Sequence, residues 1–425
     1  MLTKEAIHQV NQTKENNHAQ EYFALAEKLS AQGIDPEQLL GKLEKFQIAI
    51  PSWALGAGGT RFGRYAFGGA PRTILEKIED VGLLHALTKN SNAISLHIPW
   101  DLPKDINAIK EVARANELIF DAVNSNTFQD QAHQENSYKF GSLSHVDKAV
   151  RDQAIAHNKE VIQIGEALGS KSITVWLADG SNFPGQTNFQ KALHYTQDSL
   201  LEITNAMPDD WRLFIEYKPY EPYFYSTVIQ DWGTSFLLAN VCGPKAFTLV
   251  DLGHHLPNTN IEQIVATLLM QGKLGGFHFN DSKYGDDDLT VGSIQPYKLF
   301  LIFNELVYGM ATNKNNPPLA WMIDASHNTK DPLEDLLQSI DAILESYTKA
   351  LLVDQTALHH AQQNNDVVLC QELLQNAFKT DVRPLVREMR LKNGGALDPL
   401  LTFRETKQRQ KRIQQRGVDA LSSGL

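Results

Sequence analysis

Short apolar runs and longer amphipathic stretches alternate along most of the chain. The apolar runs are rich in β-branched and aromatic residues, which is typical of buried strands. They lie at 46–53, 94–98, 119–123, 173–177, 213–217, 247–252, 275–279 and 319–323. Between them, helical spacing of apolar residues predicts amphipathic helices. The clearest are at 74–87, 143–168, 192–206, 261–274 and 332–347.

Regular alternation of strand and helix favours a parallel sheet. Eight such units in roughly 280 residues fit the usual size of a (β/α)8 barrel, so we predict an α/β fold of the TIM barrel class. A doubly wound open sheet is the main alternative. It would gather its ligand at one switch in strand order, whereas polar residues here follow nearly every strand.

Both ends of the chain are expected to lie outside the barrel. We predict an N-terminal helical segment over 1–45, the catalytic barrel over 46–350 and a C-terminal helical extension over 351–425. The extension is expected to make subunit contacts. It ends in a basic run, Arg404–Arg416, which we interpret as a solvated helix face rather than a nucleic-acid arm because the whole chain is acidic.

Composition narrows the class of protein. The 425-residue chain carries a formal charge of −11, which argues against general binding to nucleic acid. Its two cysteines, Cys242 and Cys370, are too few for a disulfide scaffold or a thiolate metal site. No apolar run reaches membrane-spanning length, so we expect a cytoplasmic protein with no membrane partner.

Charged or imidazole side chains end four consecutive predicted strands. They are Glu216, Asp251, His278 and Asp324. Because all strands of a barrel end on one face, these side chains are expected to meet at its mouth. Three carboxylates with one imidazole suit Mn²⁺, Mg²⁺ or Co²⁺ better than a closed structural zinc site. Each residue alone is more often a helix cap or a core histidine, but the four together favour a metal site.

A second group of polar residues follows the same strands. Asp286 and Asp288 are two residues apart, so in an extended segment their side chains point the same way and both can bind one ion. His254 can provide a third ligand. An acidic surface turn is an equally good interpretation of the two aspartates. Lys218 lies two beyond Glu216 and shares its face, where it could stabilise an oxyanion of the substrate, although a lysine at the rim is the simpler alternative.

Aromatic residues end the earlier strands. Trp53, Trp100, Phe128 and Trp176, together with His97, are typical of a carbohydrate pocket, although core packing is the simpler explanation for any one ring. The glycine-rich loop after the first strand lacks the lysine and hydroxyl of a phosphate-binding loop. We expect a mobile loop that either folds over the mouth of the barrel or lets Phe62 reach the site of a neighbouring subunit.

Several runs resemble the L-rhamnose isomerase family of the xylose-isomerase-like barrels, in particular its broad-specificity bacterial branch that also acts on D-allose. The runs that carry the resemblance are 95–101, 124–128, 180–185, 250–255 and 277–288. The resemblance implies a homotetramer of (β/α)8 barrels, with a sugar as substrate. It also implies two divalent metal ions per subunit, Mn²⁺ first, with Co²⁺, Mg²⁺ or Zn²⁺ as alternatives.

The resemblance also implies a role for each candidate residue. Glu216, Asp251, His278 and Asp324 would hold a structural ion, and His254, Asp286 and Asp288 a catalytic one. His97, Lys218 and Asp324 would be catalytic, with His97 near the ring oxygen and Lys218 near O1. The implied substrate-binding residues are Trp53, Phe62, Trp100, Phe128, Trp176 and Ser326.

The implied reaction is the conversion of L-rhamnose to L-rhamnulose, with activity on D-allose, by a metal-assisted hydride shift between C1 and C2. An enediol route is the mechanistic alternative. A single-metal sugar 3-epimerase on the same barrel is the alternative function, and the second ligand set argues against it. A sugar-binding barrel without turnover is the non-catalytic alternative.

Overall fold

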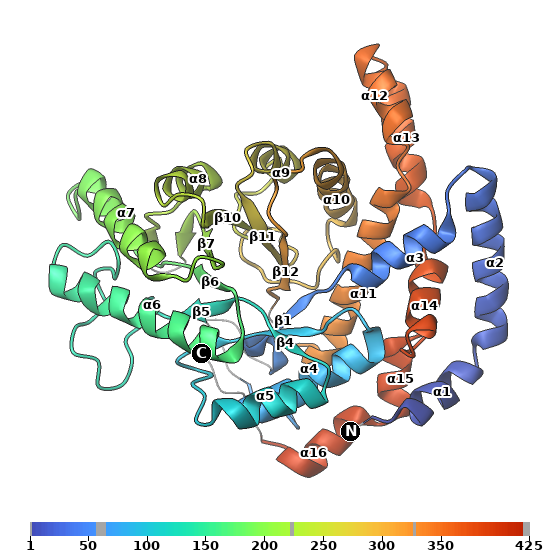
Figure 1. Cartoon of the computed structure of the whole chain (residues 1–425), viewed down its shortest axis with the longest axis horizontal. Coiled ribbons are helices and arrows are strands. Elements are labelled where there is room, and N and C mark those ends of the chain that lie inside the picture. The colour runs from blue at the N-terminus through green and yellow to red at the C-terminus, as the bar shows by residue number, and fades with distance from the viewer. Residues whose placement is uncertain (1, 57–64, 222–224, 326–328, 420–425) are drawn as a thin grey trace.

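A curled sheet of parallel strands, covered by helices on its outer side, forms the body of the protein (Figure 1). The computed structural model describes residues 2–56, 65–221, 225–325 and 329–419. Every predicted apolar run contains a strand. The strands of the main sheet are β1 (Ala49–Pro51), β2 (Ala93–Ser95), β3 (His97–Ile98), β4 (Ile119–Phe120), β5 (Val123–Ser125), β6 (Ser172–Val175), β7 (Arg212–Glu216), β10 (Ala246–Asp251), β11 (Leu274–Phe279) and β12 (Ala320–Ile323).

Neighbouring strands pair in parallel around the curl. The sheet runs β3-β5-β6-β7-β10-β11-β12-β1-β2-β4. The sheet begins with β3 and β5 and ends with β2 and β4. Along the chain β2 leads directly into β3 and β4 into β5, so the same two chain segments form both ends of the sheet. The backbone N–H of Asp121 donates to the Ile94 carbonyl and that of Asn124 to the Leu96 carbonyl, both at 2.9 Å. The sheet is therefore barrel-like, as the alternation of elements predicts.

One helix follows each strand unit and packs on the outside of the sheet. These helices are α4 (Ile74–Thr88), α5 (Ile106–Ala115), α6 (Lys148–Leu168), α7 (Phe189–Ala206), α8 (Trp232–Val241), α9 (Ile261–Met270), α10 (Pro296–Thr312) and α11 (Pro332–Leu351). Side-chain caps determine the residue at which most of these helices begin. Asp147 caps α6, which therefore begins five residues later than the apolar pattern from Leu143 suggests. Asp331 caps α11, with proline at the first helical position.

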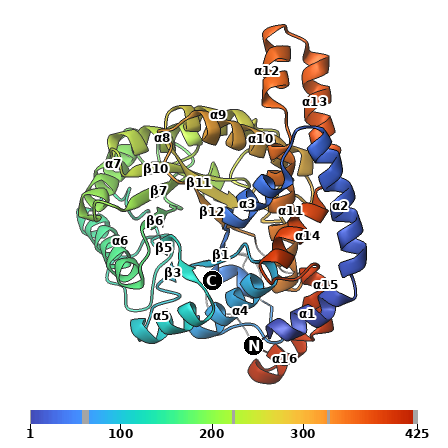
Figure 2. The same ribbon diagram turned by 45° about the vertical axis from the view of Figure 1, so that its right-hand side comes forward.

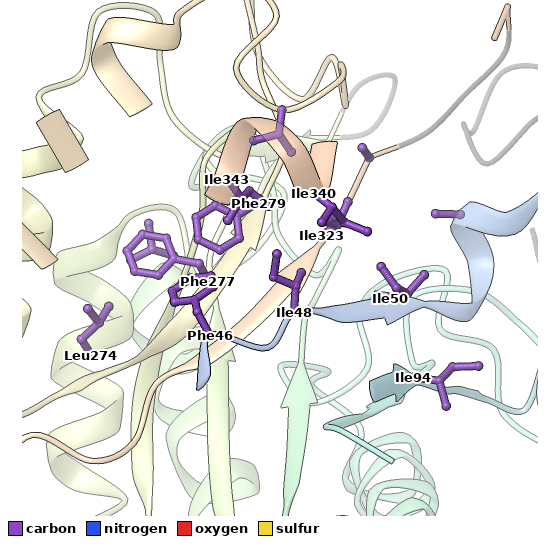
Figure 3. Packing of buried hydrophobic residues seen from close by; sticks show 14 of the residues in the cluster. Phe46, Ile48, Ile50, Ile94, Leu274, Phe277, Phe279, Ile323, Ile340 and Ile343 are labelled. Atoms are coloured by element: carbon purple, nitrogen blue, oxygen red, sulfur yellow. The ribbon is translucent and has the colours of Figure 1, made fainter. Parts of the chain in front are cut away.

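The main core lies between the sheet and its helices. Phe277 and Phe279 of β11 and Ile323 of β12 are buried in one cluster with Ile340 and Ile343 of α11 (Figure 3). A smaller cluster, which includes Phe214, Phe247 and Leu249, is separate from this layer. Side chains alternate across a strand, so the residues that share a face with Phe214 and Leu249 are Glu216 and Asp251. Glu216 and Asp251, the polar residues at the ends of these strands, therefore lie on the same face of the sheet.

Helices from both ends of the chain gather on one side of the sheet (Figure 2). They are α1 (Lys4–Gln12), α2 (Glu15–Ala31), α3 (Pro36–Lys45), α12 (Gln355–Gln363), α13 (Val367–Lys379), α14 (Arg383–Lys392), α15 (Pro399–Glu405) and α16 (Gln408–Arg416). The helix α14 packs on α2 and α3. The pair α12 and α13 projects away from the rest of the molecule in both views (Figures 1 and 2).

The basic run at the C-terminus is only in part the solvated face that we expected, because Arg404 and Lys411 are exposed but other arginines are not. Arg412 and Arg416 are buried, and each makes an ion pair with the fully buried Asp80 of α4, at 2.6 and 2.7 Å. Arg409 makes an ion pair with Asp331 at the start of α11. The sequence gives no sign of these pairs, because the acidic partners lie far away along the chain. The run therefore fastens α16 to its own subunit.

No helix in the described part of the chain is long and apolar enough to cross a bilayer.

Candidate metal centre and active site

Four donor side chains converge at the carboxyl ends of β7, β10, β11 and β12. The donor atoms of Glu216, Asp251, His278 and Asp324 all lie within 4.8 Å of one another. Strand pairing explains the convergence, since Asp251 is in register with His278 and His278 with Met322, two residues before Asp324. The structure thus brings together the first set of predicted ligands.

The cluster is electrostatically unbalanced without a cation. Burial raises the pKa of Asp251 to about 6, and the nearby charges of Asp324 and Glu216 add to this rise. Burial would also raise the pKa of Glu216, but His278 and His254 hold it below its usual value. Burial would lower the pKa of His278, yet the surrounding carboxylates raise it well above normal. In the metal-free protein, protons on the imidazoles balance part of the negative charge.

The donor set fits a divalent cation. Asp251 Oδ2 is buried and has no hydrogen-bond partner among the described residues, so one ligand atom is available. Its other oxygen, Oδ1, is held by the Asn280 amide at 2.9 Å, and the Trp53 indole donates to Asp324 Oδ1 at 2.8 Å. These hydrogen bonds hold one oxygen of each carboxylate and so fix the orientation of the other, as is usual for metal ligands. Carboxylate oxygens with one imidazole suit a borderline or hard dication.

The second predicted ligand set is organised around a buried lysine. His254 Nε2 lies 3.0 Å from Asp286 Oδ1, and the Lys218 ammonium donates to Asp286 Oδ2 at 2.5 Å. Lys218 also donates to Glu221 at 2.8 Å, and its Nζ lies 5.5 Å from the centre of the Trp176 ring. Asp288 lies in the same turn as Asp286, and both adopt a positive φ. Among the described residues, no other group of three donors meets as closely as the first set.

Aromatic side chains form a continuous wall beside these donors. The His97 ring stacks on Trp100 at 3.9 Å between centroids and meets the Trp53 and Phe128 rings edge-on. Phe128 in turn meets the Trp176 ring at 4.8 Å. Burial, with the charges of His157 and Lys77, lowers the pKa of His97 to about 3, so its imidazole is neutral at physiological pH. The predicted pocket residues therefore gather in one place.

Two of the predicted pocket residues cannot be placed. Phe62 and Ser326 lie outside the described residues.

The structure also reveals supporting residues that the sequence reasoning missed. Asp101 is buried and accepts hydrogen bonds from Lys77 Nζ at 2.6 Å, from the His97 backbone at 2.9 Å and from the Ser52 hydroxyl. Asn280, which holds Asp251, lies two residues after His278, so strand alternation could have identified it. Glu221 had no comparable signal, because it lies in the short strand β8 (Tyr220–Glu221), outside the barrel.

Comparison with known proteins identifies the family. No protein-family model matches the chain. A "probable sugar isomerase" of Rhizobium meliloti (strain 1021) is 49% identical over 424 residues, which cover 100% of this chain and 99% of that protein. The chain belongs to this sugar isomerase family. It is therefore an enzyme of the sugar isomerase and epimerase class.

Two weaker matches, to a xylose isomerase and to an L-rhamnose isomerase, support a relation to the xylose-isomerase-like superfamily. The xylose isomerase of Thermus thermophilus is 26% identical over 263 residues, 57% of this chain and 64% of that protein. The L-rhamnose isomerase of Mannheimia succiniciproducens is 29% identical over 190 residues, 38% of this chain and 44% of that protein. Both matches are partial, so they do not choose a substrate.

A solved structure agrees with the fold. The 3-keto-D-glucoside 4-epimerase YcjR from E. coli covers 70% of the isomerase and 99% of its own chain, with a TM-score of 0.51 and 13% identity. At this identity the likeness bears on the fold alone. It supports an α/β barrel-like fold. The cluster around Asp251 is the place among the described residues where a divalent metal fits.

Proposed function

We propose that the protein is a metal-dependent aldose–ketose isomerase that converts L-rhamnose to L-rhamnulose and also acts on D-allose. The observation that carries the proposal is the meeting of four donor side chains within 4.8 Å. Membership of a sugar isomerase family, with a buried lysine and an aromatic wall beside the donors, supports it. The partial match to an L-rhamnose isomerase favours L-rhamnose as the first substrate to test.

Two divalent ions per subunit, Mn²⁺ in preference to Co²⁺, Mg²⁺ or Zn²⁺, complete the proposed site. Glu216, Asp251, His278 and Asp324 would hold the first ion, and His254, Asp286 and Asp288 the second. When bound, the ions act as Lewis acids that polarise the oxygen atoms of the sugar. Asp286 contacts both His254 and Lys218, which supports a second centre next to the lysine.

His97 and the aromatic wall bind the sugar and open its ring. The faces of Trp53, Trp100, Phe128 and Trp176 exclude water and pack on the C–H surfaces of the sugar. The neutral His97 imidazole can donate a hydrogen bond from one ring nitrogen and accept one at the other. Its Nδ1 is buried without a partner among the described residues. It is therefore suited to relay a proton during ring opening, accepting it from the anomeric hydroxyl at one ring nitrogen and donating one to the ring oxygen from the other.

Lys218 and Asp324 act on the open-chain sugar. The Lys218 ammonium is held by two carboxylates and would donate a hydrogen bond to O1, where negative charge develops as the carbonyl is reduced. Asp324 has 23% of its side chain exposed, against 5% or less for the other three donors, so it is the carboxylate that substrate can reach. We assign it to the O2 hydroxyl: the carboxylate accepts the O2 proton as hydride passes from C2 to C1, and a proton is returned to O1 to complete the ketose.

The experiment that tests this function uses purified protein stripped with chelator. Mn²⁺, Co²⁺ or Mg²⁺ is then restored separately, and aldose–ketose conversion is assayed on a panel that includes L-rhamnose, D-allose and D-xylose. We expect turnover only with metal and fastest with L-rhamnose. Products that are 3-epimers of ketoses, with one ion bound per subunit, would instead identify the single-metal epimerase. Heavy deuterium uptake at C1 in D₂O would replace the hydride shift with an enediol route.

The proposal extends to the architecture of the enzyme. The pairs β2–β4 and β3–β5 join the same two chain segments, which supports a fully closed (β/α)8 barrel. We further propose that the barrels assemble as a homotetramer through the C-terminal extension. The projecting pair α12 and α13 supports this, because helices that extend from the body are well placed to contact another subunit.

A further inference from the structure

A cavity of about 350 Å³ lies among α1, α4, the end of α5 and α16. These helices meet at one corner of the molecule in both views (Figures 1 and 2). Lys89 and Glu117, which line it, directly precede the segments that lead into β2 and β4. The cavity is therefore near the amino ends of the strands, whereas the metal donors lie at the carboxyl ends. It is separate from the active site.

The lining is cationic, although the whole chain is acidic with a formal charge of −11. Five cationic side chains line the cavity, against two carboxylates. The cations are Lys4, Lys89, Lys411, Arg412 and Arg416, and the carboxylates are Glu79 and Glu117. A local excess of positive charge in a concave site attracts anions.

Not all of these charges are available to a ligand. Arg412 and Arg416 both pair with the buried Asp80, and Arg416 also lies 3.5 Å from Glu79. Lys89 lies 3.5 Å from Glu117. In contrast, Lys4 and Lys411 are exposed, and neither lies within ion-pair distance of an acidic group among the described residues. They come from opposite ends of the chain, on α1 and α16. The two lysines are the cations of the cavity that make no ion pair among the described residues.

The remaining walls suit a small polar molecule. Asn116, Gln408 and Gln415 add amide groups that can bind hydroxyls, and Leu2, Ile7 and Leu83 add apolar surface. His85 also lines the cavity. Burial, together with the charge of Lys89, lowers the pKa of His85 to about 4, so it adds no charge at neutral pH. The volume is within the range of small-molecule sites, roughly 300–1,000 Å³.

We propose that this cavity binds a small phosphate monoester, with the phosphate held between Lys4 and Lys411. Lysine ammonium groups bind phosphate as point charges, and two of them match a dianion. The amides and the apolar surface hold the organic part of the ester. The lining comes from helices that are distant in sequence, so the bound ester joins α16 to α1 and α4 and stabilises their contact. This proposal is independent of the reaction at the metal centre.

Binding of glycerol 3-phosphate to the metal-loaded protein tests the proposal by titration calorimetry. Inorganic phosphate and glycerol serve as comparison probes, and none of the three is an aldose. We expect the ester to bind more tightly than inorganic phosphate, and glycerol not to bind. Binding of inorganic phosphate alone would overturn the proposal, because the cavity would then be an ion site, and so would the absence of binding by both phosphate probes.

Paired variants locate the binding. The double variant Lys4→Gln and Lys411→Gln should weaken ester binding at least tenfold, which is about 1.4 kcal/mol. The matched control is Lys42→Gln with Lys314→Gln, two exposed lysines outside the cavity lining, and it should bind as the wild type does. Equal affinities of the two double variants would overturn the proposal. Removal of the metal by chelator should leave the affinity unchanged, and loss of binding on chelation would place the ester at the metal centre instead.

The His85 imidazole provides a second readout in solution. A bound phosphate ester, which is still a monoanion near pH 4, offsets the charge of Lys89 and should raise the pKa of His85 from its low value near 4, measured by NMR titration of the ring protons. The Lys4→Gln and Lys411→Gln variant should need at least ten times more ester for the same change in the pKa of His85. A pKa that does not change when ester saturates the wild type would contradict the assigned position.

Discussion

Asp251 occupies the most buried position of the four converging donors, with none of its side chain exposed. Its pKa is raised, and its Oδ2 has no hydrogen-bond partner among the described residues, so the carboxylate is costly to bury and a bound cation removes that cost. Replacing it with asparagine would remove the charge and keep the size of the side chain. The neighbouring Asn280 amide would also lose its charged acceptor.

We therefore expect Asp251→Asn to lower metal affinity by at least about 100-fold, the upper end of the effect of losing a residue that only supports a ligand. Metal content per subunit after dialysis, measured by mass spectrometry, checks this. Asp335→Asn is the control, because Asp335 is an equally buried aspartate that pairs with Lys330 away from the cluster. Retention of metal by Asp251→Asn would show that the carboxylate is not a ligand.

The two histidines near Asp251 link metal binding to pH. Burial would lower the pKa of His254, but Asp251 and Asp286 raise it well above its usual value, and His278 behaves in the same way. In the metal-free protein the imidazolium forms stabilise the fold. That contribution is complete below the unfolded pKa of about 6.5 and is lost as pH rises through the raised folded pKa.

A metal-ligating imidazole must be neutral, so binding near pH 7 should release protons and metal affinity should increase with pH. Calorimetry of Mn²⁺ binding in buffers of different ionisation enthalpy measures the number of protons released. We expect a net release at pH 7 and a smaller one at pH 9. Binding enthalpies that are the same in all buffers would mean that the cluster is already deprotonated without metal.

At the scale of elements, the contact between α16 and α4 depends on one buried acid. Asp80 is fully buried and pairs with Arg412 and Arg416, which are themselves buried. Removing the acid would leave two guanidinium groups in the interior without their nearest counter-charge. The loss of a partner from a buried ion pair costs about 3–5 kcal/mol, mostly because the remaining charge is uncompensated.

The variant Asp80→Asn should therefore lower the free energy of unfolding by about 3–5 kcal/mol. Urea denaturation followed by circular dichroism checks it. The matched control is Asp381→Asn, which breaks the ion pair between two exposed side chains, Asp381 and Arg383, and should cost at most about 1 kcal/mol. If the two variants are equally stable, α16 is not held by this buried triad.

For the whole molecule, periodicity was enough to predict the strands and the convergence of the donors. Glu216, Asp251 and Asp324 each end an apolar run, and the rule that parallel strands end on one face brings them together. The docking of α16 could not be predicted, because Arg412 and Asp80 are 332 positions apart and a basic helix looks the same whether it is solvated or paired. The partners of Lys218 were missed in part for the same reason. Alternation places Lys218 beside Glu216, but only the fold brings Asp286 to it, from 68 residues away.

The proposed homotetramer can be tested at the projecting helices. The helices α12 and α13 project from the body, and at the start of α13 Val367 and Val368 are 72% and 74% exposed. With Leu369, which is 40% exposed, these valines form a small apolar surface that another subunit can cover. In the proposed homotetramer a neighbouring subunit covers this surface.

Light scattering of the eluting protein should therefore give four times the 47.6 kDa mass of the chain. The double variant Val367→Asp and Val368→Asp should shift the mass to dimer or monomer, while the unfolding curve of the subunit changes little because both side chains are already exposed. Leu256→Asp is a control, since Leu256 is also exposed, at 59%, and lies on the loop after β10 rather than on α12 or α13. A wild type that elutes as a monomer would remove the tetramer. A tetramer unaffected by the valine changes would place the interface elsewhere on the subunit.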